Sequence, residues 1–229
     1  YFRTEAWSGR KQSSNFVEGG WITIDGHIVD DTKAEVNLDG RRVLKLDEDT
    51  IPTVDLPYFY ILLNKAPDTE TSHKPQQYPS VFSLLPNNFR DIDIQAVGRL
   101  DADTTGAIIL TNDGQFNHRV TSPKHHVAKI YRVTLKHAAE QSLCDKLIKG
   151  VLLDDEHETI AAAAAELIDP NTLLMTLTQG KYHQVKRMIA AAGKRVEGLH
   201  RDQFHQWRVD DFAVGEWRFL DVAEVQASI

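Results

Sequence analysis

Hydrophobic and polar positions alternate in short runs over the first fifty residues of the chain. Residues 8–18 can form a short helix, and positions 21–24 alternate as in a half-buried strand. The Asp25-Gly26 pair that follows is typical of a two-residue hairpin turn, so a second strand is expected directly after it. Residues 41–46 have the pattern of a further strand. The pattern predicts a small α/β unit at the front of the chain.

The stretch 47–57 differs from its surroundings, because it is acidic, contains two prolines and has no periodicity. Such a composition is typical of a connection between domains. We therefore predict a front domain over residues 1–50, a linker over 51–57 and a main domain over 58–229. Because residue 1 is Tyr rather than Met, we also expect the front domain to lack residues at its N-terminus.

The main domain has predicted strands separated by predicted helices at irregular intervals. Apolar or alternating runs predict strands over 58–65, 107–110, 128–135 and 171–180, and amphipathic patterns predict helices over 138–150 and 182–196. The alanine run within 159–169 predicts another helix, since alanine has the highest helix propensity. Residues 66–80 are rich in Pro, Thr and Gln, which predicts a long surface loop. This arrangement indicates an α+β fold rather than a doubly wound sheet.

The segment VGRLDADTTGAIILTNDG at 97–114 contains two carboxylates two residues apart, Asp101 and Asp103. Its first half fits a calcium-binding loop, in which a Glu is needed at the twelfth position. This chain has Asn112 there, and the apolar run 107–110 predicts a buried strand where a calcium loop continues into a helix. The sequence therefore favours a chemical role for one of the acids over calcium binding.

The composition is that of an ordinary globular protein, with 41% hydrophobic and 26% charged residues in 229. No apolar run approaches the length of a membrane span, and a single cysteine, Cys144, excludes an internal disulfide. No glycine-rich phosphate loop and no zinc-ligand spacing are present. We expect a cytoplasmic enzyme or binding protein without membrane contact.

The net charge of -7 is unevenly distributed along the chain. Residues 98–137 contain six Lys/Arg against three Asp, and residues 180–208 contain seven Lys/Arg against two acids. If these segments meet in space, they form a positive face on an acidic body that attracts a polyanion. A solvated surface of mixed charge explains the same numbers equally well.

Four segments together resemble RNA pseudouridine synthases, in the RsuA-type branch of that family. The first is GRLDADTTG with TNDG at 98–114, and the second is HRVTSPKHHVAKIYRVTL at 118–135. The third is GKYHQVKRMIAAAGKRVEGLHR at 180–201, and GGWITIDGHIV near the front resembles the end of an S4 RNA-binding domain. The resemblance covers nearly the whole chain. It implies a mainly antiparallel mixed sheet preceded by a small S4-like domain.

The resemblance implies isomerisation of a uridine that is flipped out of ribosomal RNA, by an enzyme without cofactor or metal. Asp101 would be the catalytic carboxylate, Lys186 its cationic partner and Tyr131 the ring that stacks on the uracil. Arg99 would hold the RNA backbone or the place of the flipped nucleotide, and Val185 would pack against the base. Further substrate or RNA contacts are expected from Leu100, Asn64, Lys65, His183, Arg187, Arg10 and Lys11.

Several points depart from the family pattern or stay open. The first motif has Asn64-Lys65-Ala66-Pro67 where the family has Asn-Lys-Pro, so the geometry of the following loop is in question. Asp103 is not carried over as catalytic and is expected to be a turn or capping acid. The family has a strand at the alanine run, so the resemblance places 161–168 in the sheet, against propensity. We expect a monomer acting on small-subunit rRNA. The alternatives are a large-subunit rRNA synthase and a non-catalytic RNA-binding or ribosome-assembly factor.

Overall fold

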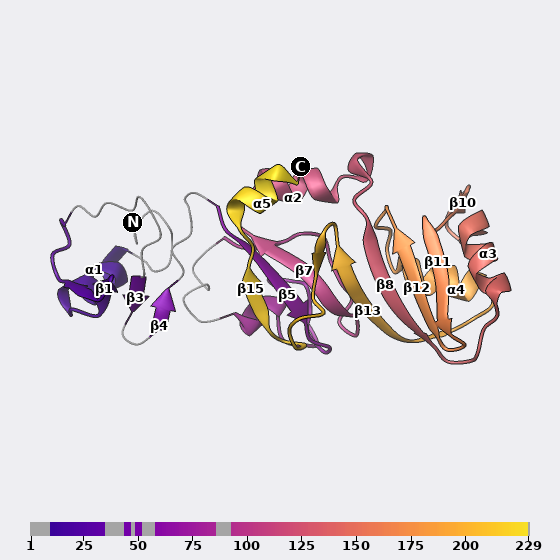
Figure 1. The fold of residues 1–229 in the computed structure, drawn as a ribbon, viewed down its shortest axis with the longest axis horizontal. Helices are drawn as coiled ribbons and strands as arrows, with labels where there is room; N and C mark the ends of the chain where they lie inside the picture. The colour runs from indigo at the N-terminus through magenta and orange to yellow at the C-terminus, as the bar shows by residue number, and fades with distance from the viewer. Residues whose placement is uncertain (1–9, 35–43, 47–48, 52–57, 86–92, 229) are drawn as a thin grey trace. The chain divides into compact units, whose positions relative to one another are not determined.

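The structure is a computed structural model that describes residues 10–34, 44–46, 49–51, 58–85 and 93–228 (Figure 1). Contacts divide the chain into two compact units, one comprising 1–59 and 85–94 and the other comprising 60–84 and 95–229. Within the described ranges, no helix is both long and apolar enough to cross a membrane.

The front unit contains one helix and a small antiparallel sheet. Helix α1 (Arg10–Glu18) is followed by β1 (Ile22–Ile24), β2 (His27–Val29), β3 (Leu44–Leu46) and β4 (Asp49–Ile51), in the sheet order β2-β1-β3-β4. The helix ends at glycine as its geometry requires: Gly20 has a φ of +71°, and the N–H of Trp21 bonds back to the carbonyl of Phe16. Ile22 is buried and lies at the centre of this small sheet.

The predicted hairpin is confirmed, because β1 and β2 pair across a turn in which Asp25 and Gly26 both have positive φ. The described part of the strand predicted at 41–46 is β3, and residues 41–43 lie outside the described residues. Strand β4 lies within the acidic stretch 47–57 and pairs with β3. That stretch therefore begins as part of the front sheet, because backbone pairing needs no apolar alternation at an edge strand.

The main unit is built on one mixed sheet whose path is β11-β12-β8-β13-β7-β5-β15 (Figure 1). In addition, β14 pairs with β13 and β6 pairs with β7. The strands are β5 (Tyr60–Lys65), β6 (Gln95–Ala96), β7 (Thr105–Thr111), β8 (Lys129–Leu135), β11 (Ala164–Asp169), β12 (Thr172–Leu177), β13 (Val196–Phe204), β14 (Trp207–Arg208) and β15 (Trp217–Phe219). Among the pairings of these described strands only β7 with β13 is parallel. The expected mainly antiparallel α+β fold is confirmed.

Two central strands form the core of this sheet. Every residue of β5 is buried, as are residues 106–111 of β7, so both strands are covered on both faces. Strand β8 instead alternates, with Tyr131, Val133 and Leu135 buried and Arg132 and Thr134 exposed. Consequently β8 presents one covered face and one open face, and Tyr131 belongs to the covered one.

Helices and short elements cover the sheet and its ends. They are η1 (Val81–Leu84), α2 (Gly114–Thr121), η3 (Pro123–His125), α3 (Gln141–Lys149), α4 (Gln184–Ala191) and α5 (Val222–Ala227), with a small hairpin of β9 (Val151–Leu152) and β10 (Thr159–Ile160). Helix α3 packs against β11, and α4 ends before Gly193, whose φ is +88°. The helix predicted at 138–150 is confirmed as α3, and the one predicted at 182–196 is confirmed over α4, although its last predicted residue, Val196, begins β13.

The helix that alanine propensity predicted over 159–169 is wrong. Residues 164–169 form β11, which pairs antiparallel with β12, as the family resemblance indicated. Alternate residues 165 and 167 are the half-buried ones, so the segment follows the period of a strand. Helix α2 was not predicted at all, although Asp113 caps it by accepting from the backbone N–H of Gln115 and of Phe116 at 3.0 and 2.9 Å.

Candidate active site

The segment that contains Asp101 is a loop between β6 and β7. Gly106, the second residue of β7, has a φ of +105°, and a Cβ added there would overlap the backbone of Arg201 on β13. Only glycine allows the parallel pairing of β7 with β13 at this point. The end of the loop that follows Asp101 is therefore fixed against β13.

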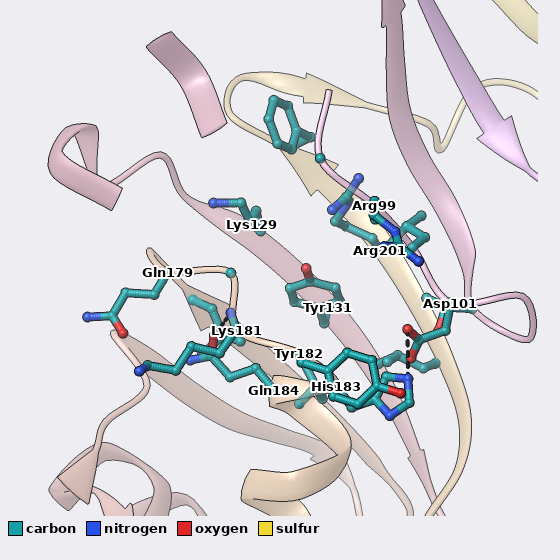
Figure 2. Close-up of a pocket in the computed structure, with 18 of the residues that line it drawn as sticks. Arg99, Asp101, Lys129, Tyr131, Gln179, Lys181, Tyr182, His183, Gln184 and Arg201 are labelled. Atoms are coloured by element: carbon teal, nitrogen blue, oxygen red, sulfur yellow. Dashed lines mark hydrogen bonds and ion pairs between the residues drawn. The ribbon is translucent and has the colours of Figure 1, made fainter. Parts of the chain in front are cut away.

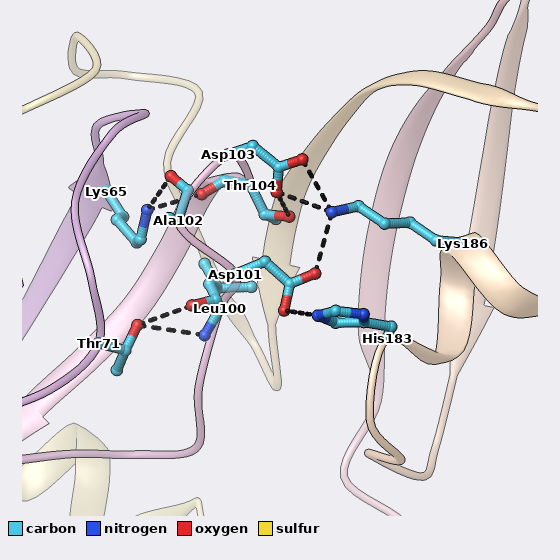
Figure 3. Close-up of polar contacts among 9 residues, drawn as sticks. All are labelled: Lys65, Thr71, Leu100, Asp101, Ala102, Asp103, Thr104, His183 and Lys186. Atoms are coloured by element: carbon cyan, nitrogen blue, oxygen red, sulfur yellow. Dashed lines mark hydrogen bonds and ion pairs between the residues drawn. The ribbon is translucent and has the colours of Figure 1, made fainter. Parts of the chain in front are cut away.

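A buried lysine and a threonine hold the same loop from the other side (Figure 3). The Nζ of Lys65 donates to the carbonyl oxygens of Ala66, Ala102 and Thr104 at 2.9, 3.1 and 2.9 Å. Burial lowers the pKa of Lys65 to about 8, against the attraction of nearby carboxylates. The Oγ1 of Thr71 donates to the carbonyl of Leu100 at 2.9 Å. The backbone on both sides of Asp101 is thus held by fixed polar contacts.

This geometry corrects the expected roles of Asn64 and Lys65, for which we predicted contacts with the substrate. Their side chains are 4% and 0% exposed, so neither is accessible to RNA. The Nδ2 of Asn64 donates to the carbonyl of Phe212 at 2.9 Å instead. Both residues lie at the end of a strand that is covered on both faces, and the side-chain nitrogen of each donates within the protein.

Both carboxylate oxygens of Asp101 have a cationic or hydrogen-bonding partner (Figure 3). Oδ2 lies 3.1 Å from the Nζ of Lys186, and Oδ1 lies 3.2 Å from the Nε2 of His183. His183 precedes α4 in a left-handed conformation with a φ of 45°, and Lys186 lies in the first turn of that helix. The predicted Asp101–Lys186 pair is therefore present, and His183 is close to the same carboxylate.

Asp103 binds the same lysine, which the sequence interpretation missed. Its Oδ1 and Oδ2 lie 2.7 and 2.9 Å from the Nζ of Lys186. Burial favours the neutral amine, but the bonds and charges of Asp103 and Asp101 raise the pKa of Lys186 above its usual value. Burial of Asp103 is likewise outweighed by Lys186, so the pKa of Asp103 is lowered. The expected role of Asp103 as a turn or capping acid is incomplete, because its charge holds Lys186.

Asp101, His183 and Lys186 belong to the lining of a cavity of about 400 Å³, and Figure 2 labels Asp101 and His183 in it. Tyr131 lines it from β8, while Arg99, Leu100 and Asp101 line it from the loop before β7. Val185 and the segment that leads into α4 form another part of the wall. The cationic side chains in the lining are Arg99, Lys129, Lys181, Lys186 and Arg201, and the only acid in the described lining is Asp101. Such a cavity attracts a polyanion and positions one carboxylate inside it.

The cavity brings together most of the predicted site residues: Asp101, Tyr131, Lys186, Arg99, Leu100, His183 and Val185. Arg187 is not part of its lining, since it pairs with Asp155 and donates to the carbonyl of Tyr182. Arg10 and Lys11 lie in α1 of the front unit. Lys129, Lys181 and Arg201 were missed, although Lys129 precedes Tyr131 by two positions and therefore shares its strand face.

The calcium alternative does not fit the arrangement of the two acids. Asp101 and Asp103 converge on the ammonium group of Lys186, which occupies the position between the two carboxylates where a calcium ion would have to bind. The chain then continues as β7, and α2 begins only at Gly114. No cluster of three or more potential metal ligands is found in the part of the chain that the structure describes.

The comparison with known proteins identifies the class to which this fold and site belong. The sequence profile described as RNA pseudouridylate synthase matches residues 59–191, which include the loop, the strand of Tyr131 and α4. The chain belongs to the RNA pseudouridylate synthase family, whose members are isomerases.

The similarity to individual proteins extends beyond this segment. Ribosomal small subunit pseudouridine synthase A of Pasteurella multocida is 35% identical over 94% of this chain and 92% of its own length. The protein of the same description from Escherichia coli is 36% identical over 93% of this chain and 91% of its own. A crystal structure described as a pseudouridylate synthase is 31% identical, with a TM-score of 0.71 over 100% of this chain and 97% of that one.

Proposed function

We propose that this protein isomerises a specific uridine of small-subunit ribosomal RNA to pseudouridine. The observation that carries the proposal is the cavity in which Asp101, paired with Lys186, lies in the same lining as the ring of Tyr131. The relatives that match over nine-tenths of the chain are described as small-subunit pseudouridine synthases, which supports the choice of RNA.

The chemistry fits the groups in the cavity. The reaction breaks the C1′–N1 bond of uridine and forms a C1′–C5 bond, while C5 loses a proton and N1 gains one. Nothing is oxidised and no group is donated, so the balance needs no co-reactant. An ionised carboxylate is needed, either to attack C1′ or C6 or to remove a proton from the ribose. Asp101 is the acid in the lining, and Lys186 and His183 hold its two oxygens in a fixed orientation.

The other residues of the cavity serve to hold the flipped-out nucleotide. The ring of Tyr131 stacks on the uracil, and Val185 and Leu100 supply apolar contacts beside it. Arg99 is exposed at the edge of the cavity and contacts the phosphate backbone or occupies the place of the nucleotide in the helix. Flipping costs a few kcal/mol of stacking and pairing, which phosphate contacts offset.

The front unit is proposed to be an S4-like domain that grips the RNA outside the active site. Lys/Arg and Asp/Glu are equal in number over residues 1–45, seven of each, so bulk charge does not explain binding there. A local face that includes Arg10 and Lys11 of α1 is needed instead. We further propose that the protein acts as a monomer in the cytoplasm, where its relatives' ribosomal RNA is found.

One experiment distinguishes the proposed function from its two alternatives, a large-subunit rRNA synthase and a non-catalytic RNA-binding or ribosome-assembly factor. Pseudouridines are mapped in both ribosomal RNAs from cells with and without this protein, and again after rescue with wild type or Asp101→Asn. We expect one small-subunit site to disappear without the protein and to return with wild type alone. Loss of a large-subunit site instead indicates the other branch of the family. Rescue by Asp101→Asn contradicts a catalytic role for this carboxylate.

A further inference from the structure

Two cations, Lys129 and Arg201, lie on the same covered part of the main sheet as Tyr131 (Figure 2). On the register of β8 with β13, Tyr131 is opposite Arg201 and Lys129 is opposite Phe204. Arg201 is 2% exposed, and its guanidinium carbon lies 6.0 Å from the centre of the Tyr131 ring. The two positive charges therefore flank the ring on which the base is proposed to stack.

Neither cation has a carboxylate partner among the described residues. The Nε of Arg201 donates to the carbonyl of Ala107 at 2.6 Å, and its buried Nη2 has no hydrogen-bond partner. The Nζ of Lys129 donates to the carbonyl of Val127 at 2.8 Å. The acid in the lining, Asp101, is directed to Lys186 and His183 instead. Two desolvated positive charges without a counter-charge are costly to bury, so their position calls for a negative ligand.

We propose that Lys129 donates a hydrogen bond to a carbonyl oxygen of the target uracil and, with the field of Arg201, stabilises negative charge on that ring during the reaction. The inference rests on the proposed function and extends it to a further group that contacts the substrate. When the C1′–N1 bond breaks, its electron pair stays on the ring and spreads to O2 and O4. When a nucleophile adds to C6, the C5=C6 pair moves toward O4. The ring therefore becomes anionic whichever atom Asp101 attacks.

The geometry favours the base over a phosphate as the partner of Lys129. Residues two apart on a strand are separated by roughly 6.6 Å on one face, which brings a lysine to the edge of a base stacked on Tyr131. An ammonium group has three N–H donors, and the contact with Val127 uses one of them. Arg99, in contrast, is an exposed cation of the lining, so a phosphate group can reach it from solvent.

Protonation of Lys129 supplies an independent readout. Burial and the charge of Arg201 lower the pKa of Lys129 to about 8. The charged form is the one that stabilises an anion, so the single-turnover rate at limiting RNA is expected to fall as the pH rises through about 8. The charged and titratable groups that share the cavity with Lys129 are Tyr131 on β8, Arg201 on β13, Arg99 and Asp101 on the loop before β7, and Lys181, Tyr182, His183 and Lys186 in and before α4.

Three variants distinguish the positive charge of Lys129 from the general effect of removing a lysine. Lys129→Met is expected to slow single-turnover conversion at saturating RNA by about tenfold or more, because a donor to a developing oxyanion is lost. RNA affinity is expected to stay near wild type. Lys129→Arg keeps a charge that does not titrate, so it should retain most of the rate and lose the alkaline fall. Lys149→Met, on the exposed face of α3 and outside the lining, is the matched control.

The decisive test pairs Lys129→Met with single-atom changes in the RNA. The target uridine is replaced by 2-thiouridine or 4-thiouridine, or its phosphate by a methylphosphonate, and single-turnover rates and affinities are measured for both proteins. A thio substitution should slow the wild type and have little further effect in Lys129→Met, since the two changes remove one contact.

The outcomes separate the inference from the proposed function. If the rate effects of Lys129→Met and the RNA change are non-additive with the methylphosphonate alone, Lys129 binds phosphate. If they are fully additive with all three RNAs, Lys129 contacts none of these atoms. Either result overturns the inference. Wild type that makes no pseudouridine in unmodified RNA overturns the proposed function itself. An unchanged saturating rate in folded Lys129→Met, checked by thermal unfolding, also refutes the inference.

Discussion

Replacement of Lys65 by Met tests whether the active-site loop is held by a buried ammonium group. The substitution keeps the length of the side chain and removes the charge and all three hydrogen bonds. If Lys65 acts as the structure indicates, both stability and the rate of the chemical step fall, while contacts with RNA phosphates do not change. If Lys65 instead contacts the substrate, as the sequence suggested, Lys65→Met weakens the contacts with RNA phosphates and leaves stability and the rate of the chemical step unchanged.

The expected loss of stability in Lys65→Met depends on whether each of the three carbonyls that accept from Lys65 finds another hydrogen-bond donor. Ala66 keeps a partner, because the Oγ1 of Thr69 donates to the same oxygen at 2.8 Å. Ala102 is half-buried, so water can replace its donor. Thr104 is 1% exposed, and an unsatisfied buried carbonyl there costs about 1–3 kcal/mol. This corresponds to a fall in Tm of about 2–4 °C per kcal/mol for a chain of this size.

The rate is expected to fall further than stability alone explains. Asp101 directly precedes Ala102, so relaxation of the loop moves the carboxylate, and a displacement of about 1 Å costs roughly 100-fold in rate. Single-turnover kinetics at saturating RNA measure this loss. The dependence of RNA affinity on salt is measured in parallel, with Arg99→Gln as the control that should reduce the log–log slope by roughly 0.9 on a duplex.

The pH dependence of the free energy of unfolding, compared between wild type and Lys65→Met, is a further test of the burial of Lys65. The pKa of Lys65 is about 8 in the folded protein and about 10.4 when unfolded. Between these values the unfolded state binds more protons, so the free energy of unfolding of wild type rises with pH relative to Lys65→Met. A reduced salt slope with unchanged Tm and unchanged saturating rate in Lys65→Met would refute the internal role of this lysine.

Three other outcomes are expected from the same assays. Tyr131→Ala should weaken engagement of the target base by about 1–3 kcal/mol, while Tyr131→Phe keeps the stacking face and isolates the hydroxyl. Asp103→Asn should slow conversion by up to about fivefold with unchanged RNA affinity, because a partly exposed pair with Lys186 is worth about 1 kcal/mol. Joint replacement of Arg10 and Lys11 by Gln should reduce the salt slope of binding and leave the saturating rate near wild type; a collapsed rate with an unchanged slope would contradict a gripping role for the front unit.

The elements that the sequence predicted well are those whose local pattern and tertiary environment agree. β5 and β7 contain uninterrupted apolar runs, 60–63 and 107–110, because both faces of the central sheet are covered. α4 is amphipathic and ends at a glycine with positive φ. The alanine run failed because its environment opposes its propensity: the backbone of β11 is paired along β12, and α3 packs against it. Helix propensities of a few tenths of a kcal/mol per residue do not outweigh a ladder of hydrogen bonds.

The site also contains residues that the sequence predicted correctly and residues whose roles it did not predict. Asp101, Tyr131 and Lys186 were predicted because they stand in motifs that the family shares, and the structure places all three in one lining. Lys65 was assigned to the substrate because motif position alone says nothing about which way a strand faces. Two of its three hydrogen-bond partners lie 37 and 39 residues away, and Lys186 lies 83 residues from Asp103. No periodicity connects residues at such separations.

The sequence could not predict the pairing of Lys129 with Arg201 for the same reason, since no periodicity connects residues so far apart in the chain. The spacing of Lys129 and Tyr131 shows that both face one side of β8, but a lysine on a strand ordinarily has an acid or water beside it. Its significance comes from the register that places Arg201 opposite Tyr131 and from the missing carboxylate in that part of the lining. Lys186 is balanced by Asp101 and Asp103, and Lys181 by Glu156. Lys129 and Arg201 have no such partner among the described residues, and a ligand that is negative, or becomes so during reaction, balances their charge.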